Sequence, residues 1–197
     1  MYPKNTHKIM EFLLRNTAEE FNVNQISRQL KISVGGAHWT LKKLLGEGLI
    51  SQKNIGNGIY YQLNLENPET RKRCELILLE SKNKALSSNP SAKIYVSDIE
   101  KASGMSKVII LFGSVIDKKE RARDIDVLFL VEKRNIKHIE KLCLEISQIR
   151  TKTVNPLFMT EQDFRKNIKN DEITKSILKK GIVISGEEAL VHALRGI

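Results

Sequence analysis

The chain has 197 residues, of which 41% are hydrophobic and 28% are charged, as is typical of folded globular proteins and not of disordered ones. No apolar run approaches the roughly 20 residues that a membrane-spanning helix needs. The opening MYPKNTHKIMEF lacks the apolar core of a signal peptide, so we expect a cytoplasmic protein without a membrane partner. The formal net charge is +10, which favours a polyphosphate partner, although a basic surface that only aids solubility is the alternative.

The few cysteines and histidines exclude two further classes of protein. Cys74 and Cys143 are too far apart for a CxxC motif and too few for a disulfide framework, so we expect both to be reduced and packed. The four histidines include no i,i+4 pair and no neighbouring cysteine, which makes a zinc site unexpected.

The first third of the chain predicts three helices. The first covers residues 4–20, and the second covers 22–30 with Asn24 as its expected N-cap. Ser33 is expected to cap a third helix, which Gly46 and Gly48 end. The buried stripe of the third helix is predicted to consist of Ala37, Leu41 and Leu44.

A hairpin is expected to follow these helices. Two β-like runs, 49–54 and 59–65, flank Ile55-Gly56-Asn57-Gly58, whose Gly and Asn residues tolerate positive φ. Helix, helix, turn, helix and hairpin is the order of a winged helix-turn-helix. Residues 1–66 resemble that superfamily, particularly in QISRQLKISVGGAHWTLKKLLGEGLI.

This resemblance implies that the third helix enters the major groove of double-stranded DNA while the wing touches the backbone. The positions that carry over to DNA contact are Gly35, His38, Trp39, Lys42 and Lys43 on the helix, with Lys53 and Asn57 on the wing. Lys42 and Lys43 suit phosphate contacts, whereas Trp39 is open to DNA contact or to packing between domains. Some winged helices serve only in protein–protein contact or dimerisation, and that alternative stays open.

A connecting segment, 67–90, is expected between the first domain, 1–66, and a second, 91–197. Pro68 suits the first turn of an amphipathic helix over 69–86, which is also the only obvious seam for a homodimer. SSNPSA, residues 87–92, is the clearest linker signal in the chain.

The second domain contains the residues with chemistry. Val108–Phe112 is an apolar run that predicts a buried strand ending at Gly113-Ser114. Asp124 and Asp126 then precede a second apolar run, and side-chain alternation places both carboxylates on the same side of that strand. Two such carboxylates can share divalent cations, Gly113 permits close backbone approach, and the Ser114 hydroxyl suits a phosphate oxygen. The alternative is a plain turn followed by two acids that cap a strand.

Gly113, Ser114, Asp124 and Asp126, with the apolar runs around them, form a GS-x9-DxD pattern. It resembles the nucleotidyltransferase superfamily of DNA polymerase beta, in its minimal branch, over roughly residues 91–185. The resemblance implies a small mixed sheet flanked by helices, so the fold class expected for the whole chain is α+β. It also implies that Gly113 and Ser114 hold a nucleoside triphosphate, while the catalytic Asp124 and Asp126 hold Mg²⁺ (or Mn²⁺).

Two departures from the family pattern concern the site. Val115-Ile116-Asp117 replaces an Ala-Arg-Gly-like run, and the basic side chains that could compensate are Lys118, Lys119, Arg121 and Arg123. The third carboxylate of active relatives is expected on the strand 153–160, where the candidate position is Asn155. Asn cannot act as a base, and it is a poorer magnesium ligand than a carboxylate. Glu161 and Asp163 lie beyond that strand and are expected to cap the helix that follows.

The leading hypothesis is a DNA-binding nucleotidyltransferase that moves a nucleoside monophosphate from a triphosphate to an unidentified hydroxyl acceptor. One alternative is a transcription regulator whose second domain is a non-catalytic nucleotide sensor or a dimerisation body. Another is an antitoxin-like protein with a toxin as its protein partner.

Overall fold

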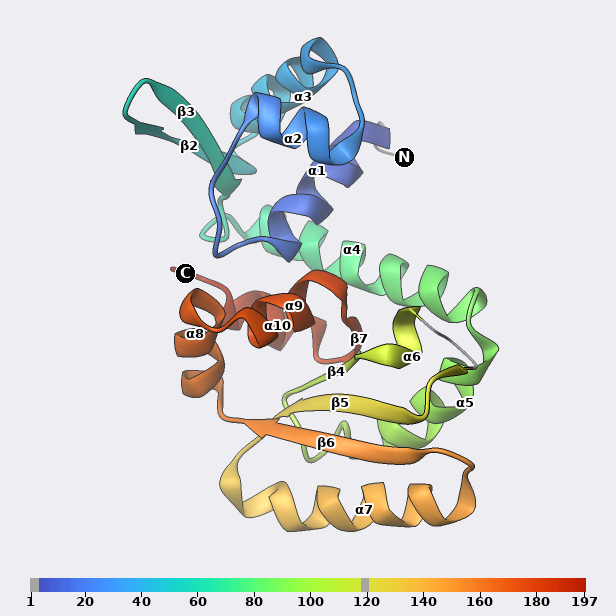
Figure 1. Cartoon of the computed structure of the whole chain (residues 1–197). Helices are drawn as coiled ribbons and strands as arrows, with labels where there is room; N and C mark the ends of the chain where they lie inside the picture. Colours follow the sequence, from blue (N-terminus) through green and yellow to red (C-terminus); the bar gives the residue numbers. More distant parts are fainter. Residues whose placement is uncertain (1–3, 118–120) are drawn as a thin grey trace. The chain divides into compact units, whose positions relative to one another are not determined.

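The computed structural model describes residues 4–117 and 121–197 and divides into two compact units (Figure 1). The first consists of Met1–Ile77 with Leu194–Ile197, and the second of Leu78–Ala193. In the part of the chain that is described, every helix is too short or too polar to cross a membrane.

The first unit contains the helices and the hairpin that the sequence predicts. In chain order, its elements are α1 (Lys4–Arg15), β1 (Phe21–Asn22), α2 (Val23–Leu30), α3 (Val34–Gly46), β2 (Ile50–Ile55) and β3 (Gly58–Leu63). The expected stripe of α3, made of Ala37, Leu41 and Leu44, is fully buried together with Ile9 of α1 and Ile26 of α2. These apolar faces form the core of the unit.

The first helix is shorter than the sequence predicts, because it ends at Arg15 and not near residue 20. The side-chain amide of Asn16 donates to the Phe12 carbonyl at 2.7 Å, and the Asn16 backbone N–H donates to the same oxygen at 3.1 Å. The chain then forms the short strand β1, in which Phe21 pairs with Tyr61 of β3. Sequence periodicity missed this strand, since two residues are too few to show alternation.

The N-cap of α2 is Asn22, so the expectation of Asn24 was wrong. Asn22 accepts from the Gln25 backbone N–H at 3.0 Å, and the Gln25 side chain accepts from the Asn22 N–H at 2.8 Å, which is a complete capping box. The cap predicted for α3 is confirmed, because Ser33 accepts from the Gly36 N–H at 3.1 Å.

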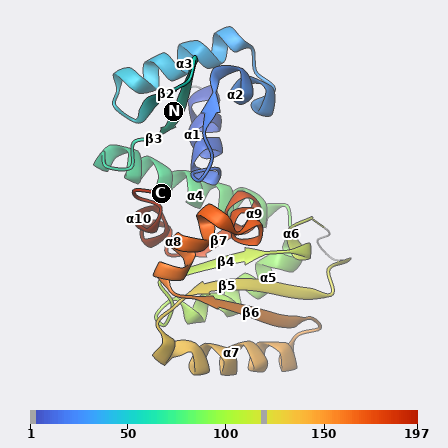
Figure 2. The ribbon, with the colours of Figure 1, turned by 60° about the vertical axis from the view of Figure 1, so that its left-hand side comes forward.

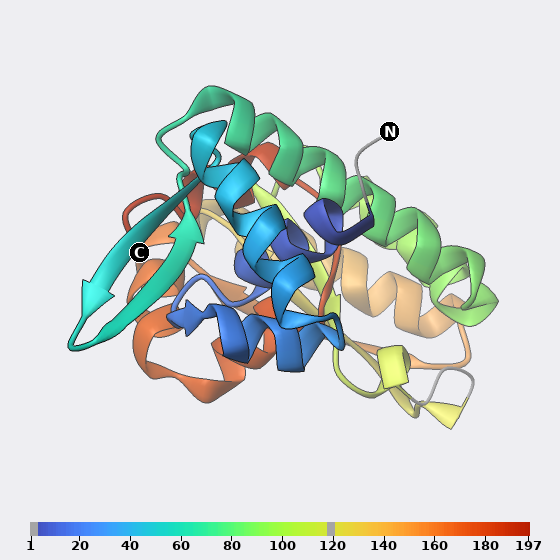
Figure 3. The same ribbon diagram turned by 90° about the horizontal axis from the view of Figure 1, so that it is seen from above.

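The hairpin of β2 and β3 is antiparallel and closes with Ile55 opposite Gly58. Gly56, the first of the two residues in the turn, has a φ of 56°, a conformation that favours glycine. The strand order is β1-β3-β2, and the hairpin projects from the helices of this unit (Figures 1 and 3).

The segment expected to be a linker is instead the tight junction of two helices. α4 (Pro68–Ser87) and α5 (Pro90–Ile99) are separated by two residues, and the second of them, Asn89, is 4% exposed. Asn89 accepts from the Ala92 N–H at 3.1 Å, and its amide donates to the Val115 carbonyl at 2.9 Å. The small polar residues therefore serve a helix cap. Leu76 and Leu79 of α4 are exposed, and a homodimer through this helix stays a prediction.

The second unit has a four-stranded mixed sheet in its described part, as expected. The strands are β4 (Val108–Phe112), β5 (Asp124–Leu130), β6 (Thr153–Met159) and β7 (Ile182–Ser185), in the order β6-β5-β4-β7. β4 is antiparallel to both of its neighbours, and β5 is parallel to β6. The parallel pair needs a crossover, which α7 (Ile136–Ile149) provides by running alongside β6 (Figures 1 and 2).

Shorter helices complete this unit. They are η1 (Glu100–Ala102), α6 (Ser114–Asp117), η3 (Lys133–Asn135), α8 (Glu161–Asn170), α9 (Glu172–Lys180) and α10 (Glu187–Ala193). The helix expected after the strand 153–160 is thus confirmed as α8.

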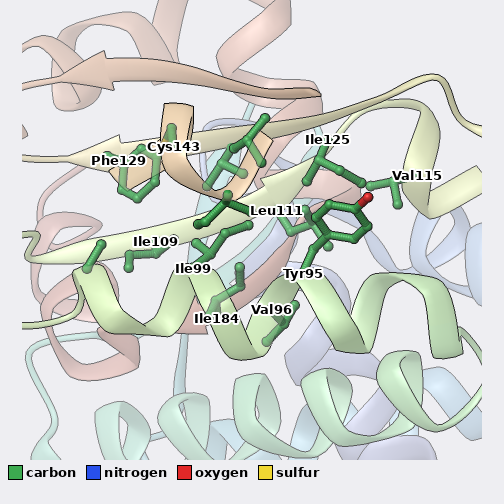
Figure 4. Close-up of a cluster of buried hydrophobic side chains, with 14 of the residues drawn as sticks. Tyr95, Val96, Ile99, Ile109, Leu111, Val115, Ile125, Phe129, Cys143 and Ile184 are labelled. Carbon is green, nitrogen blue, oxygen red and sulfur yellow. The ribbon is translucent and has the colours of Figure 1, made fainter. Parts of the chain in front are cut away.

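One face of the sheet packs against α5 and α7. Figure 4 shows Tyr95, Val96 and Ile99 of α5 meeting side chains from β4, β5, β7 and α7, namely Ile109, Leu111, Ile125, Phe129, Ile184 and Cys143. Ile125 and Phe129 of β5 point into this core. Because strand side chains alternate, Asp124 and Asp126 point to the opposite face.

The apolar face of α7 is buried except at its end. Ile139 and Ile146 are buried, but Ile149 is 69% exposed. Cys143 is buried beside them, and both it and Cys74 are free thiols, as predicted. Burial raises the pKa of the Cys74 thiol to about 12.

Candidate functional site

The two aspartates lie on β5, which is flanked in the sheet by β4 and β6. Asp126 pairs in register with Phe112 of β4 on one side and with Asn155 of β6 on the other. Asp124 and Asp126 are both half-buried, whereas Gly113 and Asn155 are exposed. The acid pair is therefore accessible from solvent at this end of the sheet.

Gly113 follows β4 and approaches Asp126 closely. Its φ is 76°, and a Cβ built on it would lie 2.1 Å from Asp126 Oδ2 and 2.9 Å from Asp126 Cγ. No side chain can occupy that position unless the carboxylate moves. The close backbone approach expected of Gly113 therefore exists, and its partner within the protein is Asp126.

Ser114 begins α6 directly after this turn. Its hydroxyl donates to Asp124 Oδ1 at 3.4 Å, a long hydrogen bond that leaves the group available to another acceptor. The structure thus brings the glycine, the serine and both aspartates together, although nine residues separate Ser114 from Asp124 in the sequence.

Asn155 lies at the position where the sequence places a third carboxylate. Its side-chain Nδ2 donates to Asp124 Oδ2 at 3.3 Å and to Asp126 Oδ1 at 3.5 Å. The parallel pairing of β5 and β6 produces this contact, since Asn155 is level with Asp126. Sequence reasoning located the residue but missed that its amide bridges the two acids.

Burial and mutual repulsion make it costly to ionise both aspartates, and the Asn155 amide offsets part of that cost. Desolvation by burial raises the pKa of Asp126 first, and the neighbouring Asp124 charge raises it further. The hydrogen bond from Asn155 acts in the opposite direction. A cation between the carboxylates would remove the same penalty.

Other carboxylates considered from the sequence are engaged elsewhere. Glu161 Oε2 lies 3.0 Å from Lys107 Nζ. Asp163 accepts from the hydroxyl of Thr160, which is the actual N-cap of α8, at 2.7 Å. Across residues 4–117 and 121–197, no three His, Cys, Asp or Glu side chains form a group that could hold a metal.

Two carboxylates with an open side fit a magnesium ion that arrives with a nucleotide. Mg²⁺ is commonly bound by one or two carboxylates and by substrate phosphates, in contrast to a cage made wholly of protein. Asp124 and Asp126 would hold the ion, and the exposed side of the pair leaves room for phosphate oxygens. The donor set therefore fits a hard divalent cation.

The chain that leads to Asp124 is anchored by a residue that sequence reasoning missed. Lys152 Nζ donates to the Ala122 carbonyl at 2.5 Å, and the Lys152 N–H donates to the Tyr95 hydroxyl at 2.9 Å. No sequence motif marks this contact.

Four basic residues between Ser114 and Asp124 were proposed to supply positive charge. Arg121 and Arg123 are exposed, and Lys118 and Lys119 lie outside the described residues.

The residues predicted to contact DNA are all exposed in the first unit. They are Gly35, His38, Trp39, Lys42 and Lys43 on α3, with Lys53 and Asn57 on the hairpin. The helical positions differ by three, four, seven and eight from Gly35, so they share one face of α3. Trp39 is 60% exposed, so it is not a core residue of the first unit.

The lysines on this surface are not equivalent. Lys43 Nζ lies 3.9 Å from Glu47 and 5.9 Å from the centre of the Trp39 ring. Lys53 Nζ lies 2.9 Å from Glu20. Lys42 has no ion-pair partner among the residues that the structure describes. It is therefore the cation on α3 that is most available to a phosphate.

A comparison with known families bears on the second unit. Residues 95–189 match the family model described as Polymerase beta, Nucleotidyltransferase. The matched segment starts in α5, ends in α10, and contains the whole four-stranded sheet with the acid pair. This match supports the nucleotidyltransferase function expected from the sequence, and it does not reach the first unit. No curated protein and no solved structure matches the chain.

Proposed function

We propose that the second domain transfers a nucleoside monophosphate from a nucleoside triphosphate to a hydroxyl acceptor, with Mg²⁺ or Mn²⁺ as its cofactor. The observation that carries this proposal is the convergence of Gly113, Ser114, Asp124 and Asp126 at one end of the sheet. The family match over residues 95–189 supports the same class of reaction.

Each residue has a distinct task in this reaction. Asp124 and Asp126 hold the cation, which when bound neutralises charge on the phosphates. Ser114 turns its hydroxyl from Asp124 to a phosphate oxygen, and Gly113 keeps the approach free of a side chain. The acceptor oxygen forms a bond to the α-phosphorus, the bond to the bridging oxygen of the leaving group breaks, pyrophosphate departs, and the acceptor proton passes to solvent.

We also propose that residues 1–66 are a winged helix-turn-helix that binds double-stranded DNA through α3 and the hairpin. The support is the order of the elements and the exposure of all seven candidate residues on those two elements. Lys42 contacts a phosphate, while His38 and Trp39 face bases or sugars. The domain boundaries at 66 and 91 belong to this proposal.

A second candidate function is favoured by Asn155. An amide at this position cannot take a proton from an acceptor, so the domain would bind a nucleotide and change the DNA affinity of the chain without turnover. This reading predicts that a triphosphate shifts DNA binding while no product forms.

The decisive assay follows α-phosphate label from each of four triphosphates into acceptors in a cell lysate, with Mg²⁺ or Mn²⁺ present. We expect label transfer by the wild type and none by the Asp124→Asn/Asp126→Asn variant. The matched control is Glu140→Gln/Glu145→Gln, which removes two exposed charges from α7. Equal transfer by the aspartate variant would show that the site is elsewhere, and transfer by neither protein favours the nucleotide sensor.

A further inference from the structure

The amide of Asn155 occupies a position that bears on how many cations the site can hold. We infer that Asn155 limits the acid pair to a single divalent cation, the one that enters with the nucleotide. This inference rests on the proposed nucleotide binding, and it assigns to one side chain the metal stoichiometry of the site.

The first argument is geometric. Asn155 Nδ2 is 3.3 Å from an oxygen of Asp124 and 3.5 Å from an oxygen of Asp126, so one hydrogen-bond donor spans both acids. A donor nitrogen carries partial positive charge and repels a cation. The carboxylate oxygens that face Asn155 are thus already engaged by the protein, and a cation is left with the other oxygens of the pair.

The second argument concerns charge. The acid pair supplies two negative charges, and one divalent cation balances them. A second cation would need another anionic ligand, because Mg²⁺ and Mn²⁺ gain little from neutral amides once they have lost water. Across residues 4–117 and 121–197, no third His, Cys, Asp or Glu side chain joins the pair in a group that could hold a metal. The protein therefore supplies two acidic ligands to the site, Asp124 and Asp126.

The third argument concerns how the site is held before any cation binds. Two carboxylates lie together at this end of the sheet, and the amide of Asn155 donates a hydrogen bond to each of them. Asn155 thus stabilises the two carboxylates when the site holds no cation. An aspartate at this position would reverse the effect by adding a third negative charge to the cluster.

These arguments predict what Asn155→Asp does. The variant should bind a second cation, and its total affinity for Mn²⁺ should rise about ten- to hundredfold because a carboxylate replaces an amide donor. It should be less stable than the wild type without metal and should gain more stability from Mn²⁺. Asn170→Asp, an exposed change at the end of α8, adds the same charge away from the acid pair and serves as the control.

The test is an electron paramagnetic resonance titration of Mn²⁺ against the full chain with a non-hydrolysable triphosphate present. We expect one bound Mn²⁺ in the wild type and in Asn170→Asp, and a second in Asn155→Asp. Two bound ions in the wild type, or no additional ion in Asn155→Asp, would overturn the inference.

Two further readouts separate its failure from failure of the proposed function. If no triphosphate binds to the wild type at any Mn²⁺ concentration, nucleotide binding itself is refuted, and the inference with it. Melting curves with and without Mn²⁺ show whether each variant is folded. If Asn155→Asp does not fold, the ion count in the wild type still decides, because two bound Mn²⁺ ions there would contradict the inference.

Discussion

The two candidate sites of this chain are built in opposite ways. The acid pair of the second unit is made by convergence, since β4, β5 and β6 bring Gly113, Asp126 and Asn155 into contact from distant parts of the sequence. The surface on α3 comes from one continuous segment, whose side chains share a face because of their helical spacing. Within it, Lys43 Nζ lies 5.9 Å from the centre of the Trp39 ring.

This difference determines what each site can reveal without a ligand. At the acid pair, the raised pKa of Asp126 and the steric demand on Gly113 are properties that a purely structural turn would not need. On α3, exposed cations are equally compatible with a solvated helix face. The chemistry of the second unit thus has internal support, whereas DNA binding depends on a partner that must be supplied.

The sharpest test of the convergent site is Gly113→Ala. The added Cβ would meet Asp126 Oδ2 at 2.1 Å in a backbone conformation with φ of 76°. We expect a loss of about 1–3 kcal/mol in the free energy of unfolding and a roughly ten- to hundredfold loss of nucleotide affinity. Denaturant unfolding and nucleotide titration measure the two effects. Gly104→Ala, where nothing lies within 4 Å, should change neither, and a Gly113 variant that binds nucleotide normally would contradict the site.

The continuous surface is tested by Lys42→Ala/Lys43→Ala. Each phosphate contact that is lost should reduce the slope of log affinity against log salt by about 0.9, and the pair should weaken duplex binding roughly tenfold. Titration of a duplex at several salt concentrations measures both. Lys137→Ala/Lys141→Ala on the exposed face of α7 removes the same charge in the other unit. Equal effects of the two variants would mean that only net charge matters. Lys42→Ala alone should weaken duplex binding more than Lys53→Ala does, because Lys53 is already paired with Glu20.

Sequence reasoning found the elements of both units because the signals were local. Caps such as Ser33, the Gly56-Asn57 turn and the apolar runs of β4 and β5 each determine structure within a few residues. The same reasoning failed where longer-range contacts decide the outcome. β1 exists because Phe21 pairs with Tyr61, and the polar segment after α4 became a cap because the Asn89 amide reaches Val115.

The candidate site shows the same limit. Side-chain alternation placed Asp124 and Asp126 on one side of a strand, and the family resemblance pointed to Asn155 as the third position. Sequence reasoning could not show that the Asn155 amide donates to both acids, since that contact depends on the parallel register of β5 and β6. Nor could it show Lys152 holding the chain before Asp124, because no residue pattern accompanies a single lysine that reaches a backbone carbonyl.

A smaller effect separates stability from DNA binding on α3. Gly35 is exposed in the first turn of the helix with no atom near its missing Cβ. Gly35→Ala should therefore raise the free energy of unfolding by about 0.5 kcal/mol, because alanine favours the helix. If Gly35 lies against DNA, duplex affinity should fall at the same time. Urea denaturation and duplex titration are the two measurements, and unchanged affinity would remove Gly35 from the proposed interface.

The smallest effect concerns the charge of the acid pair itself. Because the pKa of Asp126 is raised in the folded state, that state binds a proton more readily than the unfolded chain does. Stability should therefore fall as pH rises above about 4, where an unfolded aspartate is already ionised. Asp126→Asn should remove this contribution and raise the melting temperature at pH 7 by about 1–3 °C without metal.

When Mn²⁺ and a triphosphate are added, the wild type should become more stable than Asp126→Asn, because only the wild type keeps both acids. Asp171→Asn is a control for which we expect the opposite pH dependence of stability. Hydrogen bonds from Thr174 lower the pKa of Asp171, so its contribution is present above the usual aspartate range and is lost as pH falls. Melting curves from about pH 2 to about pH 8 distinguish the two signs, because the contribution of Asp171 is lost only below the usual aspartate pKa of about 4. A wild type whose stability is not increased by Mn²⁺ and nucleotide would mean that the charge of Asp126 is a cost without a ligand to offset it.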